Sequence, residues 1–445
     1  MFGATSQPYD AREPEFKAVV LTMSDNDMYP LTERNNMTKA LLPIANKPML
    51  WYILQWLEQG GILDIKIVTT RESEADISNY IEVYKGMSNI TVKGLSEVSG
   101  SADALRQLAP QIKGDVIVVP CDLLIDVPAV HFLDLFRIRR PAMATMFYEV
   151  MRSEGGGGSS KARVPLPVVG IDQPTSRLVL LEDVESDEEL QLPMSLIRRF
   201  PSMAVSDKMQ DSHVYVLQKW LLDYIVNNTD IESLQDDLLP LLVSAQSDPE
   251  LFESSKLEKY MLKASSEQDV TDDHDAAALQ FELSESAAKP TNPTSSDSLQ
   301  VFVYIRRGGI AGRADQIPQY CDLNYIATKL SIDPRVEESA ELLKNVQVSA
   351  DSMVGQSSKL GERCLVKRSV IGPHCIIGHN VKITNSVIMD HVTIGDNAVI
   401  ESSILCKEAT IPDGFQIINC EIGAKVSVFE NSSLNKKTRT VDDYM

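Results

Sequence analysis

The chain has 445 residues, of which 43% are hydrophobic and 24% charged, a balance typical of globular proteins and a length sufficient for two or three domains. Its 63 acidic residues outnumber its 42 basic residues, so the net charge is −21. Because binding to nucleic acid depends on basic groups that displace counterions, this composition argues against a protein that binds nucleic acid directly.

The sequence has no evident targeting or metal-binding motif. Residues 1–15 are polar, which predicts a disordered N-terminus and no secretory signal, and no apolar run approaches the roughly 18 residues of a membrane span. The cysteines form no CxxC pair, so we expect free thiols in a reducing compartment, the cytosol, and neither a metal ion nor another cofactor. They are Cys121, Cys321, Cys364, Cys375, Cys406 and Cys420.

Residues 16–243 have the pattern of an α/β domain. The β-branched runs "KAVVLT", "DIKIVTT" and "GDVIVVPCD" predict strands buried on both faces, at residues 17–22, 64–70 and 114–122. Between the first two, "NKPMLWYILQWLEQGG" predicts a helix with proline at its start and glycine at its end. Strand, helix and strand in this order indicate a parallel sheet with right-handed crossovers.

Composition marks the segments that interrupt or follow this domain. The glycine-rich stretch 153–163 predicts a flexible insertion. The acidic run 182–189 predicts a solvated loop, with a docking site for a basic partner as the alternative. Residues 244–299 are acidic and serine-rich and carry little apolar surface to offset chain entropy, so we expect a disordered linker. A connecting segment, 300–350, opens with the strand "VFVYIRR", and 431–445 form a tail.

Residues 351–430 carry a 17-residue repeat. Aliphatic residues recur at spacings of six, six and five, in the manner of hexapeptide repeats, with small residues two positions before them and glycine often one position after. This pattern predicts a three-sided parallel β-helix whose coils stack about 4.8 Å apart and whose ends and flat faces a partner could cover. The predicted core residues are Val354, Leu360, Val366, Ile371, Ile377, Ile383, Ile388, Ile394, Ile400, Leu405, Ile411, Ile417, Ile422 and Val428.

Histidines in the repeat raise a minor alternative, acyl transfer, because β-helices occur in acyltransferases that use a histidine as base. His374 and His391 lie one period apart, so we expect them on adjacent coils, with His379 also in the repeat. A histidine on a turn is most often a solvated side chain, and no long loop interrupts the repeat to form a substrate cleft. Acyl transfer is therefore disfavoured.

The region from Tyr29 to Leu50 resembles the nucleotide-sugar pyrophosphorylases. Their N-terminal signature runs LAxGxGTRLxPLT and then PKPLLPVxxKPM. Here "YPLT" leads into "TKALLPIANKPML", so that Lys39 matches the first lysine of the second half. The resemblance implies a Rossmann-like α/β nucleotidyltransferase-like domain followed by a C-terminal left-handed parallel β-helix.

The first half of that signature is altered. In the family, glycines let backbone N–H groups wrap the triphosphate, and an arginine stabilises the charge that develops on the phosphates. Here Asp25 and Asn26 stand in the loop, and Asp27 falls where the arginine would be. An anion in place of a cation opposes phosphate binding, so we expect a site that is inactive as an enzyme.

Two further motifs match the family's site. "PCDLLID" places Asp122 where the family binds magnesium, but without the arginine and the glycines a structural role at a strand end is favoured for this residue. "GSADALR" matches a loop that lines the nucleotide, and Asp211 is a candidate second metal ligand. The predicted degenerate pocket comprises Asp25, Asn26, Asp27, Lys39, Gly100, Asp103 and Asp122, with no catalytic residue and no bound metal.

The order of these motifs, with "CDLLIDVPAVHFLDLFR", "AGRADQIPQYCDLNYIA" and then the repeat, resembles the gamma subunits of eukaryotic translation initiation factor 2B, a guanine-nucleotide exchange factor. The resemblance implies a non-catalytic regulatory and scaffolding subunit that pairs with the catalytic epsilon subunit. It also implies a decamer with alpha, beta and delta subunits, whose client is initiation factor 2. We expect no helical exchange domain after the β-helix. The alternative is a sugar-nucleotide pyrophosphorylase, such as a mannose-1-phosphate guanylyltransferase, or its regulatory homologue.

Overall fold

The computed structural model describes residues 15–23, 28–33, 36–96, 98–150, 167–183, 190, 192–268, 299–330, 333–428, 434–435 and 438–439. The predicted insertion and nearly all of the predicted disordered N-terminus lie outside these ranges. In the ranges described, none of the helices combines the length and the apolar character that a membrane crossing requires.

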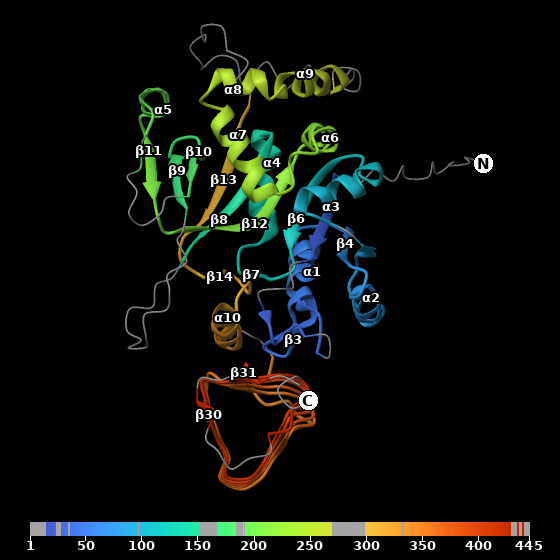
Figure 1. The fold of residues 1–445 in the computed structure, drawn as a ribbon, viewed down its shortest axis with the longest axis vertical. Coiled ribbons are helices and arrows are strands. Elements are labelled where there is room, and N and C mark those ends of the chain that lie inside the picture. Colours follow the sequence, from blue (N-terminus) through green and yellow to red (C-terminus); the bar gives the residue numbers. More distant parts are fainter. Residues whose placement is uncertain are drawn as a thin grey trace, which may run out of the picture.

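A ten-stranded mixed sheet forms the centre of the N-terminal domain (Figure 1). Its strands are β1 (Phe16–Leu21), β4 (Asp64–Thr70), β5 (Asn89–Leu95), β6 (Asp115–Pro120), β8 (Met143–Glu149), β9 (Val168–Asp172), β10 (Arg177–Glu182), β11 (Met203–Ser206), β12 (Met209–Leu217) and β13 (Val301–Arg306). They lie in the order β11-β9-β10-β13-β8-β12-β6-β1-β4-β5. Both β4 and β6 pair with β1 in parallel, which confirms the predicted arrangement of the three β-branched runs.

Helices cover both faces of this sheet. They are α1 (Met49–Gln59), α2 (Glu74–Val83), α3 (Ser101–Leu108), α4 (Ala129–Arg139), α5 (Met194–Arg199), α6 (Lys219–Asn227), α7 (Leu239–Ala245), α8 (Pro249–Ser254) and α9 (Leu257–Gln268), with the short 3-10 helices η2 (Lys39–Leu41) and η3 (Ala109–Gln111) and the π-helix η4 (Leu234–Leu238). A further helix, α10 (Ile317–Leu330), packs outside this sheet. Successive residues Val19 and Val20 of β1 belong to two different core clusters, because neighbouring side chains of a strand point to opposite faces. Ile53 of α1 lies in one cluster and Leu222 of α6 in the other.

The structure differs from the predicted linker 244–299 over its first part. Residues up to 268 form the end of α7 and all of α8 and α9, and Phe252 and Leu257 are buried in the domain core. The carboxylate of Asp248 accepts hydrogen bonds from the first backbone N–H groups of α8, with Pro249 in the first turn. The polar composition of the whole stretch hid these local helix signals; residues 269–298 lie outside the described ranges.

The domain boundary also differs from the predicted one. The predicted strand at the start of the connecting segment is present as β13, but it inserts between β8 and β10 of the N-terminal sheet and therefore belongs to that domain. A second return is the short strand β14 (Ala311–Arg313), which pairs with β7 (Leu123–Ile125). The chain thus re-enters the N-terminal domain before it starts the C-terminal one.

The C-terminal domain is a parallel β-helix of three sheets, as the repeat predicts. Its strands are β15 (Glu341–Leu342), β16 (Gln347–Val348), β17 (Met353–Val354), β18 (Lys359–Leu360), β19 (Leu365–Lys367), β20 (Val370–Ile371), β21 (Ile376–Ile377), β22 (Lys382–Thr384), β23 (Val387–Ile388), β24 (Thr393–Ile394), β25 (Val399–Glu401), β26 (Ile404–Leu405), β27 (Thr410–Ile411), β28 (Gln416–Ile418), β29 (Glu421–Ile422), β30 (Leu434–Asn435) and β31 (Thr438–Arg439). The last two lie in the predicted tail and extend two of the sheets.

The three sheets have different surroundings. We name them the domain-facing sheet (β17-β20-β23-β26-β29-β31), the outer sheet (β16-β19-β22-β25-β28-β30) and the third sheet (β15-β18-β21-β24-β27). The fourteen aliphatic residues of the repeat are each 4% exposed or less and form one cluster inside the prism. The rings of His374 and His391 stack with centroids 4.9 Å apart, which confirms that they lie on adjacent coils.

The small residues of the repeat form a buried ladder. The hydroxyl oxygens of Ser352, Ser369 and Ser386 each accept a hydrogen bond from the backbone N–H of the residue 17 positions later, at 3.1–3.3 Å. The hydroxyl of Ser403 does the same for Cys420. A larger side chain would not fit between coils, so the ladder explains why small residues precede the aliphatic positions.

Helix α10 lies between the two domains (Figure 1). Its Tyr320 hydroxyl donates to the carbonyl of Pro43 in the N-terminal domain at 2.6 Å, and its Tyr325 hydroxyl donates to the carbonyl of Asn385 in the β-helix at 2.7 Å. Apolar side chains from both domains pack around it, including Leu42, Met49, Met353, Val387 and Ile404. One helix therefore joins the N-terminal domain to the domain-facing sheet.

We predict that Ile400→Ala, in the middle of the β-helix, lowers the free energy of unfolding by about 2–5 kcal/mol, because it leaves a cavity among packed aliphatic side chains. Denaturant unfolding of the full chain measures the change. Thr410→Ala on the exposed side of the third sheet is the control and should change it by less than about 0.5 kcal/mol. Equal effects of the two substitutions would contradict the assignment of the core.

Candidate functional site

A cavity of about 430 Å³ lies at the carboxyl ends of β1 and β6. This is the edge at which open α/β sheets bind their ligands. Residues lining the cavity include Lys39, Gly100, Asp122, His213 and Arg313. Three residues of the predicted degenerate pocket, Lys39, Gly100 and Asp122, are thus brought together here.

Asp122 is held by two cations inside this cavity. The Lys39 ammonium lies 2.8 Å from Oδ2 of Asp122. The guanidinium of Arg313 donates to both carboxylate oxygens, at 3.1 Å to Oδ1 and 3.0 Å to Oδ2. The side chains of Lys39 and Asp122 are each 2% exposed and that of Arg313 is 10% exposed. We call these three residues the buried ion cluster.

Local structure positions each member of the cluster. Lys39 begins the turn η2, and Asp122 follows the end of β6 by two residues. Arg313 is 191 residues away from Asp122 in the chain, but β14 pairs with β7 so that Arg313 lies opposite Leu123. The backbone N–H of Ala314 also donates to the carbonyl of Asp122 at 2.8 Å.

The cluster sets the charge of its members. Burial alone would raise the pKa of Asp122, but the charges and hydrogen bonds of Arg313 and Lys39 hold this pKa well below its usual range. Burial opposes the charge on Lys39, yet Asp122 raises the pKa of Lys39 above its ordinary value. All three groups are therefore charged at neutral pH, with a net charge of +1.

The cluster does not fit a magnesium ion. A carboxylate that binds Mg²⁺ must offer oxygen lone pairs to the metal, whereas both oxygens of Asp122 accept hydrogen bonds from cations. Asp211, the candidate second ligand, does not line the cavity and accepts hydrogen bonds from the Tyr215 hydroxyl and the His213 backbone. Among the residues that the structure describes, no group of three or more His, Cys, Asp and Glu side chains is placed to hold a metal ion.

Two titratable groups near the cluster are shifted towards their neutral forms. Burial, which outweighs hydrogen bonds from Tyr215 and His213, raises the pKa of Asp211 to about 6. Burial and the charge of Arg313 lower the pKa of His213 to about 3. The cavity therefore contains a neutral imidazole, which supplies neither a cation for phosphate nor a proton at neutral pH.

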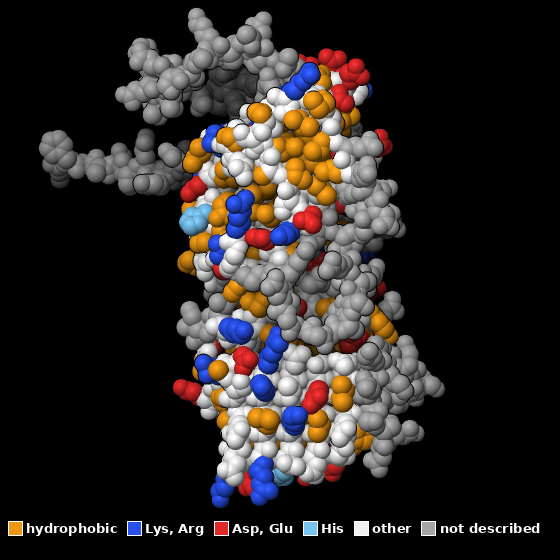
Figure 2. All heavy atoms as spheres, turned by 90° about the vertical axis from the view of Figure 1, so that its left-hand side faces the viewer, with side chains coloured by type: hydrophobic (Ala, Val, Ile, Leu, Met, Phe, Trp, Pro, Cys, Tyr) orange, Lys and Arg blue, Asp and Glu red, His pale blue; other side chains and the backbone are white. Residues whose placement is uncertain are grey.

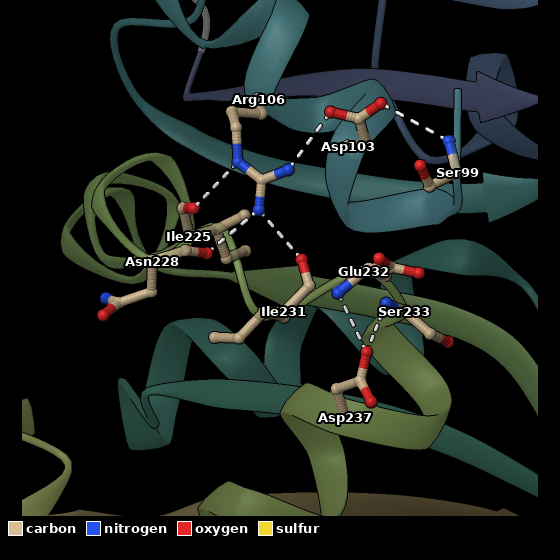
Figure 3. Close-up of polar contacts among 9 residues, drawn as sticks. All are labelled: Ser99, Asp103, Arg106, Ile225, Asn228, Ile231, Glu232, Ser233 and Asp237. Atoms are coloured by element: carbon tan, nitrogen blue, oxygen red, sulfur yellow. Dashed lines mark hydrogen bonds and ion pairs between the residues drawn. The ribbon is translucent and has the colours of Figure 1, made fainter. Parts of the chain in front are cut away.

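The "GSADALR" segment supports the fold around the cavity (Figure 3). The guanidinium of Arg106 donates to the backbone carbonyls of Ile225, Asn228 and Ile231, at 2.8–3.2 Å. Asp103 accepts from Arg106 at 3.1 Å and from a backbone N–H of the preceding loop. These two residues therefore fasten α3 to the loop after α6.

Gly100 is needed at the same junction because the backbone approaches it closely. A Cβ at this position would lie 2.4 Å from the carbonyl oxygen of Glu232. The same oxygen accepts a hydrogen bond from the N–H of Ala102, and the Ser101 hydroxyl accepts from the N–H of Leu234. Asp237 holds the other side of the junction through the N–H groups of Glu232 and Ser233, which Figure 3 shows converging on its carboxylate.

The predicted pocket residues thus divide into three groups. Lys39, Asp122 and Gly100 line the cavity, while Asp103 is engaged with Arg106. Asp25, Asn26 and Asp27 lie outside the described residues. Sequence reasoning missed Arg313; it stands in "AGRADQIPQYCDLNYIA", but nothing in its spacing links it to Asp122.

Comparison with known proteins supports the assignment of both domains. A family model described as nucleotidyl transferase matches residues 26–156, and one described as EIF2B subunit epsilon LbH domain matches residues 335–434. The chain is 31% identical over 361 residues to translation initiation factor eIF2B subunit gamma of Schizosaccharomyces pombe, covering 79% of this chain and 72% of the relative. The gamma subunit of Caenorhabditis elegans is 29% identical, over 53% and 60% of the two chains. The epsilon subunit of Dictyostelium discoideum is 24% identical, over 53% and 34%.

We predict that Asp122→Asn lowers the free energy of unfolding by about 3–5 kcal/mol at pH 7, because it leaves two buried cations without their carboxylate. The folded-state pKa of Asp122 lies below its unfolded-state value, so its contribution is fully present above about pH 4 and is lost as the pH falls through the folded-state pKa. The difference between the wild type and Asp122→Asn should therefore shrink below about pH 4. Denaturant unfolding across this pH range measures it.

Asp126→Asn is the matched control. Asp126 also binds an arginine through both oxygens, at 2.8 and 3.0 Å from Arg306, but the two side chains are 31% and 30% exposed. A half-exposed pair contributes about 1 kcal/mol or less. If Asp122→Asn lowered the free energy of unfolding no more than Asp126→Asn does, the cluster would not stabilise the domain.

Proposed function

The chain belongs to the family of eIF2B gamma subunits, and from this premise we propose that it is a non-catalytic regulatory and scaffolding subunit of the eIF2B complex. In this role it pairs with the epsilon subunit and supports GDP/GTP exchange on initiation factor 2 during translation initiation. The sugar-nucleotide pyrophosphorylase alternative is not favoured, because the related proteins carry eIF2B subunit names.

The proposal depends on one observation: both carboxylate oxygens of Asp122 are already bound by cations of the chain itself. In a working nucleotidyltransferase this carboxylate would bind magnesium, which neutralises charge on the transferred phosphates. Here Lys39 and Arg313 saturate it. The sequence adds that Asp27 replaces the arginine of the family signature, so an anion stands where a cation is required.

Residues in the second half of the family signature make structural contacts, and these contacts support a scaffolding role. The segment "PIANKP" forms a tight hairpin of β2 (Pro43–Ile44) and β3 (Lys47–Pro48), in which Ala45 and Asn46 both have positive φ. The backbone N–H of Ala45 donates to the side chain of Asn324 in α10 at 3.0 Å. The Asn46 amide donates to the carbonyl of Ile371 in the β-helix at 3.0 Å. This hairpin therefore fixes the relative positions of the two domains.

We propose that the chain enters a decamer with alpha, beta, delta and epsilon subunits in the cytosol, with initiation factor 2 as the client. A joint between two domains that is held by hydrogen bonds and apolar packing suits this role, because a subunit that presents surfaces to several partners must hold those surfaces in a constant arrangement.

Catalysis is tested by pyrophosphate release. Full-length chain is incubated with a nucleoside triphosphate, magnesium and mannose 1-phosphate or glucose 1-phosphate. We predict release no faster than that of Lys39→Ala, because the magnesium ligand is occupied. Clear turnover that Lys39→Ala abolishes would contradict the non-catalytic assignment.

Complex membership is tested by purification of the tagged full chain from its own cells. We predict that an epsilon subunit and initiation factor 2 co-purify with it, in amounts measured by quantitative mass spectrometry. Their absence from the purified material, at low salt and without detergent, would refute the proposed role.

A further inference from the structure

The three outer faces of the β-helix differ in what covers them. Val387 and Ile404 on the domain-facing sheet are buried with α10. On the third sheet, Lys359 pairs with Glu341 at 3.0 Å on the neighbouring coil. On the outer sheet, the outward side chains from β16 to β28 are exposed or half-buried.

Four cations gather on the outer sheet and at its corner with the third sheet. Lys344, Arg363, Lys367 and Lys382 are all exposed, and we call them the basic face. Lys382 pairs with Glu401 at 3.0 Å. Figure 2, in which the outer sheet faces the viewer in the lower half, shows blue side chains interspersed with orange ones and with a few red ones, and Glu401 is the carboxylate paired with Lys382.

The register of the coils brings these cations near one another. The backbone N–H of Arg363 donates to the carbonyl of Lys344 at 3.1 Å, so these two residues lie on adjacent coils. Strand β19, which contains Lys367, pairs with β22, which contains Lys382. The basic face therefore spans three consecutive coils, about 10 Å along the prism.

Three of these cations have no carboxylate within ion-pair distance in the part of the chain that the structure describes. No such contact involves Lys344, Arg363 or Lys367, although Glu362 precedes Arg363 in the chain. Like charges held close together repel one another, and a partner's carboxylates would relieve that repulsion. The net charge of the chain is −21, so this group of cations differs in sign from the chain as a whole.

Aliphatic side chains between the cations favour a protein partner over nucleic acid. Leu365, Val399 and Ile418 lie half-buried on the same sheet, where a flat protein surface could cover them. The described outward side chains of this sheet include no aromatic group on which a base could stack. The whole chain has a net charge of −21 and therefore repels a polyanion, and four cations are too few to offset this repulsion.

We propose that the basic face is a docking surface for an acidic surface of another protein chain. Carboxylates of the partner pair with Lys344, Arg363 and Lys367, while Leu365 and Val399 become buried beneath it. This surface goes beyond the proposed function, which names partners but no site on this chain that binds them.

Zero-length crosslinking tests the proposal on the native assembly. The tagged full chain is purified at low salt with its partners, treated with nuclease and then with a carbodiimide, which joins lysine amines to carboxylates. Mass spectrometry should find Lys344, Lys367 or Lys382 joined to aspartate or glutamate of another chain. Crosslinks from these lysines only to acidic residues of this chain would overturn the proposal.

Charge reversal provides the second measurement. In Arg363→Glu/Lys367→Glu, retention of the crosslinked partner should fall at least about fivefold, whereas Lys359→Glu on the third sheet should change it less than about twofold. Equal retention by the two variants, or loss of the partner from the wild type on nuclease treatment, would contradict the proposal. Both residues are exposed, and the crosslinks of the wild type decide the question even if the double variant is unstable.

The two proposals fail in different ways. Absence of an epsilon subunit from the wild-type material refutes the proposed function, whatever the basic face binds. Retention of epsilon with no effect of charge reversal, and no crosslink from the basic face to another chain, refutes only the docking surface.

Discussion

The ion pairs of the buried Asp122 carboxylate hold together three segments of the chain that are far apart in the sequence. The carboxylate binds Lys39 from the turn before the hairpin and Arg313 from a strand almost two hundred residues later. Charges in an interior are stable only when each is paired and hydrogen-bonded, so the three residues require one another. Together they line the cavity at the carboxyl ends of β1 and β6 and hold β14, the strand that precedes α10.

The same residues connect the cavity to the joint between the domains. Lys39 lies just before the hairpin that contacts α10 and the β-helix, and Arg313 lies just before α10 itself. The segment that resembles a catalytic signature thus contacts both α10 and the β-helix and helps to orient the C-terminal domain. Retention of "TKALLPIANKPML" is therefore understandable without catalysis, because the hairpin and its lysine hold the two domains together.

The regular patterns in the sequence predicted the regular secondary structure. Contacts between segments that are far apart in the chain could not be predicted from these patterns. The 17-residue period predicts the β-helix because each coil repeats the same packing, and the β-branched runs predict the parallel strands around β1. Asp122 and Lys39 could be found by resemblance, but their partner Arg313 depends on the pairing of β14 with β7. Helices α8 and α9 were hidden in a polar stretch because their few buried residues, such as Phe252, find their partners only in the folded core.

The geometry makes Asp122 a structural anion that is held by two cations, and not a metal ligand. A crystal structure of the full chain, grown with Mn²⁺ and a nucleoside triphosphate and measured at the manganese absorption edge, tests it directly. We expect no anomalous peak within about 2.5 Å of the Asp122 carboxylate and an unchanged two-point contact with Arg313. A manganese ion bound to Asp122, with Arg313 displaced, would contradict this assignment.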